Sequence, residues 1–268
     1  MGRERYGGAM AGDSVLVAVD FTADTLRLRL THLEGEAVAD ERWPLPALAD
    51  EDAWGWEVGG RIATLFAREA QRKSALAIGV AAPGPVDPAK GRLLRSVEGQ
   101  DAWSGLAIAE VLRRHIDVPV ATSTRVSAAL LAERWRGAAR GVEDVLYVSL
   151  RGVPVAAALV GGREVRGARF EAGALPAVPQ PEPGTRLAGR DLETAAGLLA
   201  DAVALLDPAL VLIDAELQHA EPLIPLLQRV ISEVAPGPKV MASALGEDGP
   251  LQGAMILAST VAYEGERS

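Results

Sequence analysis

The feature that most constrains the fold of this chain is a pattern of strands that occurs twice. Near the N-terminus, the apolar run 15–20 precedes a segment of alternating character, 25–31. Runs and alternation of this kind are typical of strands, and the pair predicts a β-hairpin. The pattern begins again at 145–149 and 153–160, with Gly161 and Gly162 as the next turn. The repetition predicts two similar lobes in a chain of 268 residues.

Helical and strand-like segments alternate through the rest of the chain. Apolar residues recur at helical spacing in segments 52–72, 106–114, 127–136, 191–206, 221–234 and 253–263. Further strand-like runs occupy segments 37–43, 75–82, 118–121, 210–214 and 239–243. This alternation favours an α/β fold with mixed sheets that helices cover on both faces.

The point at which the strand pattern begins again predicts the boundary between the two lobes. We expect residues 1–14 to be a short flexible N-terminus, 15–124 to form the N-terminal lobe and 125–268 the C-terminal lobe. Proline and glycine crowd the stretch 176–184, which predicts a loop inside a linker at 176–190.

Composition excludes several kinds of site. The formal charge of −9 disfavours a general nucleic-acid-binding role, and the short cluster Arg134, Arg136 and Arg140 is expected on a solvated helix face. The absence of cysteine excludes disulfides, thiolate zinc sites and cysteine nucleophiles. No segment approaches ~20 uninterrupted apolar residues, and the N-terminus lacks the apolar core of a signal peptide. We therefore expect a soluble, cytoplasmic protein that binds neither membrane nor nucleic acid directly.

Several short motifs lie in order along nearly the whole chain. They are the segments 19–25, 79–87, 103–105, 132–141, 161–173 and 243–254. Together they resemble the ROK family of bacterial sugar kinases and sugar-responsive repressors. Each motif is weak by itself, but their order and spacing imply the family's fold, a two-lobed actin-like ATPase (ribonuclease H-like) architecture with mixed β-sheets flanked by helices.

The resemblance implies two glycine-rich turns that hold ATP phosphates, because phosphate must approach bare backbone N–H groups. The first turn runs from Asp20 to Thr25 without a glycine, and it places Asp24 near where phosphate would sit. The second begins at Arg151 and keeps one glycine, while Pro154 removes an N–H donor. Asp214-Ala215 stands where the family has Gly-Gly near adenosine. Neither turn has the composition of a phosphate cradle.

The resemblance also implies a catalytic aspartate at the start of the helix that ends in Ala132-Glu133. Counting back from Glu133 puts Arg125 at that position. Arginine stays protonated and cannot act as a general base. Ala174 and Ala177 stand where the family has its sugar-binding Glu and His, and the linker at 176–190 replaces its zinc segment. We therefore expect no catalytic residue, no metal site and no cofactor.

Three residues stay candidates for ligand binding: Asp20, Asp24 and Arg125. Asp20 matches the family's first-strand aspartate, which helps to organise Mg·ATP, but it could equally cap a turn. Asp24 could be a turn residue or a cation ligand beside Asp20. Arg125 could bind an anion between the lobes, or it could pair with Asp20 or Asp24.

Other side chains have ordinary structural interpretations. The three histidines, His32, His115 and His219, lie far apart in sequence and are expected at the surface. Trp54 and Trp56 could form an aromatic platform or pack the start of a helix onto the sheet.

The combined replacements predict a catalytically degenerate ROK-like protein, a pseudo-sugar-kinase with a binding, regulatory or assembly role. One alternative is the effector-like domain of a sugar-responsive transcriptional regulator that lacks its own helix-turn-helix. A second is an active ATP-dependent sugar kinase with relocated residues. The resemblance further implies a homodimer, and a small-molecule or protein ligand is expected.

Overall fold

The computed structural model describes residues 14–33, 35–69, 74–96, 101–180, 187–234 and 237–265. Residues 1–13 of the predicted N-terminal tail and residues 181–186 of the predicted linker lie outside these ranges. The chain divides into two compact units, which are described one at a time. The first contains residues up to Ala128 together with Pro250 onwards, and the second contains Ala129–Gly249.

The first unit is built on a five-stranded mixed sheet with the order β3-β2-β1-β4-β7. Its strands are β1 (Ser14–Phe21), β2 (Thr25–His32), β3 (Ala37–Pro44), β4 (Ser74–Ala82) and β7 (Val120–Thr124). β1 pairs antiparallel with β2 and parallel with β4, so the hairpin predicted from the alternating pattern is confirmed. A small ribbon that the sequence did not predict follows β4 and consists of β5 (Val86–Asp87) and β6 (Arg92–Leu93).

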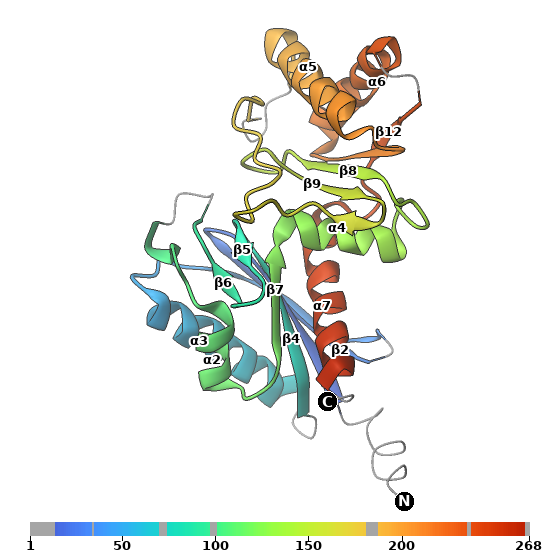
Figure 1. The fold of residues 1–268 in the computed structure, drawn as a ribbon. Helices are drawn as coiled ribbons and strands as arrows, with labels where there is room; N and C mark the ends of the chain where they lie inside the picture. The colour runs from blue at the N-terminus through green and yellow to red at the C-terminus, as the bar shows by residue number, and fades with distance from the viewer. Residues whose placement is uncertain are drawn as a thin grey trace, which may run out of the picture. The chain divides into compact units, whose positions relative to one another are not determined.

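Helices cover both faces of this sheet (Figure 1). They are α2 (Glu51–Glu69), α3 (Ile108–His115), the first turn of α4 (Arg125–Arg136) and nearly all of α7 (Gly249–Gly265), with the 3-10 turn η1 (Asp101–Trp103) before α3. Side chains alternate across a strand. Val17, Val19 and Phe21 of β1 therefore share one core with α2 and α3. Ala18 packs on the other face, against Leu251 and Ala254 of α7.

The position of α7 differs from the predicted domain division, which assigned all of 125–268 to the second lobe. A Cβ atom at Gly79 of β4 would overlap the carbonyl oxygen of Ala254, and a Cβ at Gly253 would overlap that of Ala128. Because these glycines allow backbone to approach backbone, α7 packs closely on the first sheet and on the start of α4. The last helix of the chain thus completes the first unit.

The second unit repeats the arrangement with the sheet order β10-β9-β8-β11-β12. Its elements are the rest of α4, then β8 (Val145–Ser149), β9 (Val155–Val160), β10 (Arg163–Glu164), α5 (Gly189–Leu206), β11 (Leu210–Asp214), α6 (Leu217–Val234), β12 (Lys239–Ala242) and the 3-10 turn η2 (Gly246–Asp248). The antiparallel and parallel pairings match those of the first sheet strand for strand. The two-lobed α/β fold predicted from the repeated pattern is therefore confirmed.

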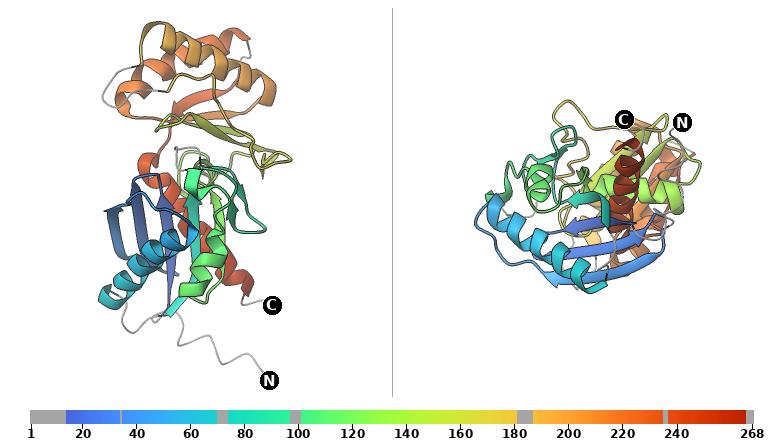
Figure 2. Two further views of the ribbon diagram at one scale, coloured as in Figure 1. Left: turned by 90° about the vertical axis from the view of Figure 1, so that its left-hand side faces the viewer. Right: turned by 90° about the horizontal axis from the view of Figure 1, so that it is seen from below.

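Helices α5 and α6 lie side by side on one face of the second sheet (Figures 1 and 2). Leu146 and Val148 of β8 face them and share their core. The end of α4 lies on the opposite face, where Glu133 is close enough to Tyr147 of β8 to influence its titration. The second sheet is therefore covered on both faces, as the first one is.

Two element boundaries differ from their predictions for local reasons. The strand β7 extends to Thr124 and α4 begins at Arg125, two residues before the predicted start, because the Thr124 hydroxyl accepts a hydrogen bond from the N–H of Ser127 at 3.0 Å and caps the helix. The strand β9 begins at Val155 rather than 153. Gly152 has a positive φ of 81° and Pro154 cannot donate to a ladder, so the turn is longer than predicted.

Candidate functional site

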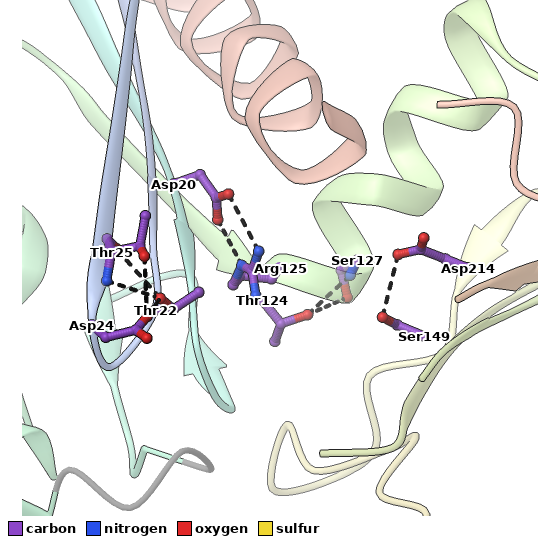
Figure 3. Close-up of polar contacts among 9 residues, drawn as sticks. All are labelled: Asp20, Thr22, Asp24, Thr25, Thr124, Arg125, Ser127, Ser149 and Asp214. Carbon is purple, nitrogen blue, oxygen red and sulfur yellow. Dashed lines mark hydrogen bonds and ion pairs between the residues drawn. The ribbon is translucent and has the colours of Figure 1, made fainter. Parts of the chain in front are cut away.

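The end of β1 and the start of α4 bring a carboxylate and a guanidinium together (Figure 3). Arg125 Nε donates to Asp20 Oδ1 at 2.7 Å, and Nη2 donates to Oδ2 at 3.4 Å. The Asp20 side chain is only 2% exposed, whereas that of Arg125 is 23% exposed. A buried carboxylate is costly unless it is paired. Arg125 supplies that pairing from the position where the resemblance implies a base.

Strand register explains why residues so far apart in sequence meet. Asp20 of β1 lies opposite Ala81 of β4, and Ala82 of β4 lies opposite Thr124 of β7. All three strands run parallel, so their carboxyl ends meet at one edge of the sheet. Thr124 then caps α4, which places Arg125 as the first residue of the helix at that edge.

Asp24 lies in the turn between β1 and β2. Its Oδ1 accepts hydrogen bonds from the hydroxyl of Thr22 at 2.8 Å and from that of Thr25 at 3.0 Å. The hydroxyl of Thr22 also accepts a bond from the backbone N–H of Thr25. The bonds from Thr22 and Thr25 lower the pKa of Asp24. The carboxylate thus serves the turn, which is one of the two roles the sequence allowed.

A second buried carboxylate, at the end of β11, is also paired with an arginine. Arg151 Nε donates to Asp214 Oδ1 at 2.6 Å, and its Nη2 donates to the carbonyl oxygen of Ala215 at 3.1 Å. The Ser149 hydroxyl donates to Asp214 Oδ2 at 3.3 Å (Figure 3). The Asp214 side chain is 4% exposed. The guanidinium therefore lies at the end of β11, where the resemblance implies a Gly-Gly pair near adenosine.

Sequence reasoning missed this second pair, although it singled out both residues. The available signal was position, since Ser149 and Asp214 each end an apolar strand. Those strands are parallel neighbours in the sheet, and Ser149 lies opposite Asp214. Neighbouring parallel strands present their last residues at one edge, so Arg151, two residues further on, falls within reach.

Tyr147 and Glu133 are buried near the same end of the second sheet. Burial, followed by the negative charge of Asp214, raises the pKa of Tyr147 well above its usual value. Glu133 is fully buried and accepts hydrogen bonds from the Ser243 hydroxyl at 2.6 Å and from the backbone N–H groups of Leu245 and Ala138. Glu133 thus ties α4 to the segment that follows β12, which gives the Ala-Glu motif a structural role.

The histidines do not all lie at the surface. His219 is buried, which corrects the prediction, and its Nδ1 accepts a hydrogen bond from the N–H of Leu187 at 3.1 Å. That bond gives the buried Nδ1 atom of His219, a residue of α6, a hydrogen-bond partner inside the core. Among the residues that the structure describes, no group of three or more His, Asp or Glu side chains could hold a metal ion.

The tryptophans do not form a platform. Trp54 is buried against Phe21, with the ring centroids 5.1 Å apart. Trp103 also packs against Phe21, with the ring centroids 5.5 Å apart. Trp56, by contrast, is exposed and lies edge-on to His115. Of these two tryptophans of α2, it is Trp54 that packs the helix start onto the sheet.

Within the described ranges, no helix is both long enough and apolar enough to cross a bilayer.

A family model described as "ROK family" matches residues 16–185, which is more than half of the chain. A putative xylose repressor from Caldicellulosiruptor sp. (strain Rt8B.4) is 32% identical over 103 residues, which cover 38% of this chain. That alignment spans only a quarter of the repressor, at 25% of its length.

Solved structures of the same family share the fold across most of the chain. A ROK family transcriptional regulator, described as a homolog of the E. coli MLC protein, superposes with a TM-score of 0.77 at 17% identity, covering 95% of this chain and 80% of the regulator. A ROK family glucokinase from Streptomyces griseus, in complex with glucose and AMPPNP, gives 0.71 at 18% identity, covering 92% and 99%. The ROK hexokinase from Thermus thermophilus gives 0.70 at 22% identity, covering 94% and 100%. Kinases and a regulator thus match the fold about equally well.

Proposed function

The chain belongs to the ROK family, and on that premise we propose that it acts as a binding, regulatory or assembly protein rather than as a sugar kinase. The observation that carries the proposal is the ion pair between Asp20 and Arg125. Removing a proton from a sugar hydroxyl requires a group that can accept it at neutral pH. Arg125 cannot accept one, and its guanidinium engages the carboxylate that the resemblance links to Mg·ATP.

The two turns support the same proposal. Phosphate binding needs backbone N–H groups that point at the ligand. In the first turn, the hydroxyl of Thr22 already accepts the N–H of Thr25, and the carboxylate of Asp24 adds a negative charge. In the second turn, the guanidinium of Arg151 donates hydrogen bonds to the carboxylate of Asp214 and to the carbonyl oxygen of Ala215. Each turn, taken by itself, thus holds contacts of its own that a bound phosphate group would have to displace.

A coupled assay for ADP formation with Mg·ATP and a panel of hexoses tests the proposal directly. We expect no hexose-dependent ADP above background, with an active ROK glucokinase as the positive control. The Asp20→Asn variant serves as the matched negative control. Hexose-dependent turnover that Asp20→Asn abolishes would overturn the proposal in favour of an active kinase with relocated residues.

A regulatory role has specific support, since the relatives include a repressor and a transcriptional regulator. In this second candidate function, the chain is the effector-like part of a regulator, and a partner supplies the DNA contact. Affinity purification from native extract, followed by electrophoretic mobility assays at increasing salt, tests it. Salt-sensitive DNA retention by the complex and not by the chain alone is expected. The homodimer that the resemblance implies and the cytoplasmic location expected from the sequence are part of this proposal.

A further inference from the structure

A cavity of about 460 Å³ lies at the amino end of β7, within the first unit. Of the residues that the structure describes, those that line it are Arg113 in the last turn of α3, the connecting residues Asp117, Val118 and Pro119, and Val120 at the start of β7. The volume falls in the range of small-molecule sites, about 300–1,000 Å³. Arg113, Asp117 and Pro119 are exposed, so the cavity opens to solvent.

The cavity adjoins an open sheet edge. β7 is the outermost strand of the first sheet (Figure 1), and within the described residues it pairs with β4 alone. The N–H of Ile78 in β4 donates to the carbonyl oxygen of Pro119 at 2.9 Å, and Ile78 lies opposite Val120. In a parallel ladder, alternate residues of a strand bond to the neighbour, and those between them point their N–H and C=O groups the other way. The N–H and C=O of Val120 therefore face the open edge, where neither bonds to a described residue.

Two unpaired charges line the same cavity. Arg114 donates to Asp52 at 3.0 Å and to Glu110 at 2.7 Å, so its charge is already used. Arg113 and Asp117, by contrast, form no hydrogen bond or ion pair with any residue that the structure describes. The cavity thus offers one cation, one anion, one backbone donor and one backbone acceptor.

This set of groups matches a short peptide. The guanidinium of Arg113 suits a carboxylate, and the carboxylate of Asp117 suits an ammonium group. An edge strand pairs with an extended segment by exchanging two hydrogen bonds with one of its residues. A simple anion would use Arg113 but would be repelled by Asp117. The two charges together therefore favour a ligand that carries both signs.

We propose that this cavity binds an unblocked short peptide. The carboxylate of the peptide pairs with Arg113, its ammonium group pairs with Asp117, and a middle residue exchanges both backbone hydrogen bonds with Val120. Val118 and Pro119 supply apolar surface for the side chains of the peptide.

The site lies at the far end of β7 from the buried ion pair. β7 runs from Val120 to Thr124, and α4 begins at the next residue, Arg125. Peptide binding therefore leaves the pair between Asp20 and Arg125 intact. This inference does not depend on whether the chain transfers phosphate.

NMR titration of the valine-methyl-labelled protein with trialanine tests the site, in the homodimer that the resemblance implies as well as in a single chain. The methyl signals of Val118 and Val120 are expected to shift and to saturate with a dissociation constant of about 1 mM, since a small peptide on an open surface makes few contacts. The signal of Val203, which is buried in the second unit, should not move. Unchanged Val118 and Val120 signals, or shifts of equal size at Val203, would refute the proposal.

Blocked peptides test each contact without altering the protein. N-acetyl-trialanine lacks the ammonium group and trialanine amide lacks the carboxylate, and each should bind about two- to five-fold more weakly, as expected for an exposed ion pair. Trialanine methylated on its middle nitrogen cannot donate to the carbonyl oxygen of Val120 and should bind about ten-fold more weakly. Equal affinities for all four peptides would mean that the proposed contacts do not form.

Protein variants assign each charge to its end of the peptide. Arg113→Gln should abolish the preference for a free carboxylate and keep that for a free ammonium group, and Asp117→Asn should do the reverse. Arg140→Gln removes an equal charge from an exposed residue of the second unit and should alter neither preference. All three side chains are exposed, so circular dichroism melts should match the parent protein. The proposal fails if the Arg113 and Asp117 variants keep both preferences.

Discussion

The two units share one strand order but hold their buried carboxylates differently. In the first unit, Asp20 lies at the end of β1 and pairs with Arg125, which lies 105 residues later. In the second unit, the buried acid Asp214 lies at the end of β11, the strand beside β8. It accepts hydrogen bonds from both Arg151 and the Ser149 hydroxyl. Within the described residues, Arg125 is the side chain that hydrogen-bonds Asp20, whereas Arg151 and Ser149 both donate to Asp214. The difference predicts how much each unit depends on its arginine.

Arg125→Asp should have the largest effect, because it places a second carboxylate beside the buried Asp20. Breaking a buried ion pair costs about 3–5 kcal/mol, and we expect the lower part of that range because Arg125 is partly exposed. Urea unfolding followed by circular dichroism measures the loss. Arg125→Lys keeps the charge and should cost less. Equal unfolding midpoints for the Asp and Lys variants would contradict the neutralising role of Arg125.

Arg151→Ala should destabilise the protein less, by about 1–2 kcal/mol, because the Ser149 hydroxyl still donates to Asp214. The same urea titration compares the two units directly. The double variant Arg151→Ala with Ser149→Ala removes both donors and should approach the Arg125→Asp loss. If Arg151→Ala alone costs as much as Arg125→Asp, the hydroxyl contributes nothing and the two units are alike.

Tyr147→Phe should act only at high pH. The folded state raises the pKa of Tyr147 above the ordinary value of 10.0. Its contribution to the free energy of unfolding is therefore fully present below pH 10 and is lost as the pH rises toward the folded pKa. Removing the hydroxyl abolishes that loss and shifts alkaline unfolding to higher pH. Melting temperatures between pH 8 and 12 check this. Unchanged alkaline unfolding would show that other groups govern it.

Asp24→Asn should have the smallest effect, confined to the turn of the first unit. The folded pKa of Asp24 is lowered, so its contribution is present above the ordinary value of 3.8 and is lost as the pH falls through the folded value. The variant should melt slightly earlier at pH 7 and equally with the parent at the acid end of the range. A difference that persists at low pH would assign the effect to lost geometry rather than lost charge.

The sequence predicted strand ends better than it predicted partners. Asp20 and Asp214 were recognisable because each closes an apolar run, and runs of this kind mark buried strands. Pairing with Asp20 was one of the alternatives left open for Arg125. The Arg151 pair required the knowledge that β11 lies beside β8, a fact of sheet order that no local pattern contains.

The predictions that were wrong, for α7 and for His219, have a related cause. The helical pattern of α7 shows that one side is apolar but not which sheet that side covers. The deciding contacts involve Gly79 and Gly253, whose lack of a side chain gives no hydrophobic signal. His219 was expected at the surface because nothing in its spacing reveals that the N–H of Leu187 supplies its hydrogen bond.

The return of α7 to the first unit has a consequence for the order in which the chain is made. The second unit is continuous from Ala129 to Gly249, so all of it leaves the ribosome before the last helix does. The first sheet, although it is synthesised earlier, still exposes Ala18 and Ala81 until Leu251 and Ala254 arrive. We expect the later unit to finish folding first, with the earlier one exposed to chaperones and proteases until α7 has left the ribosome.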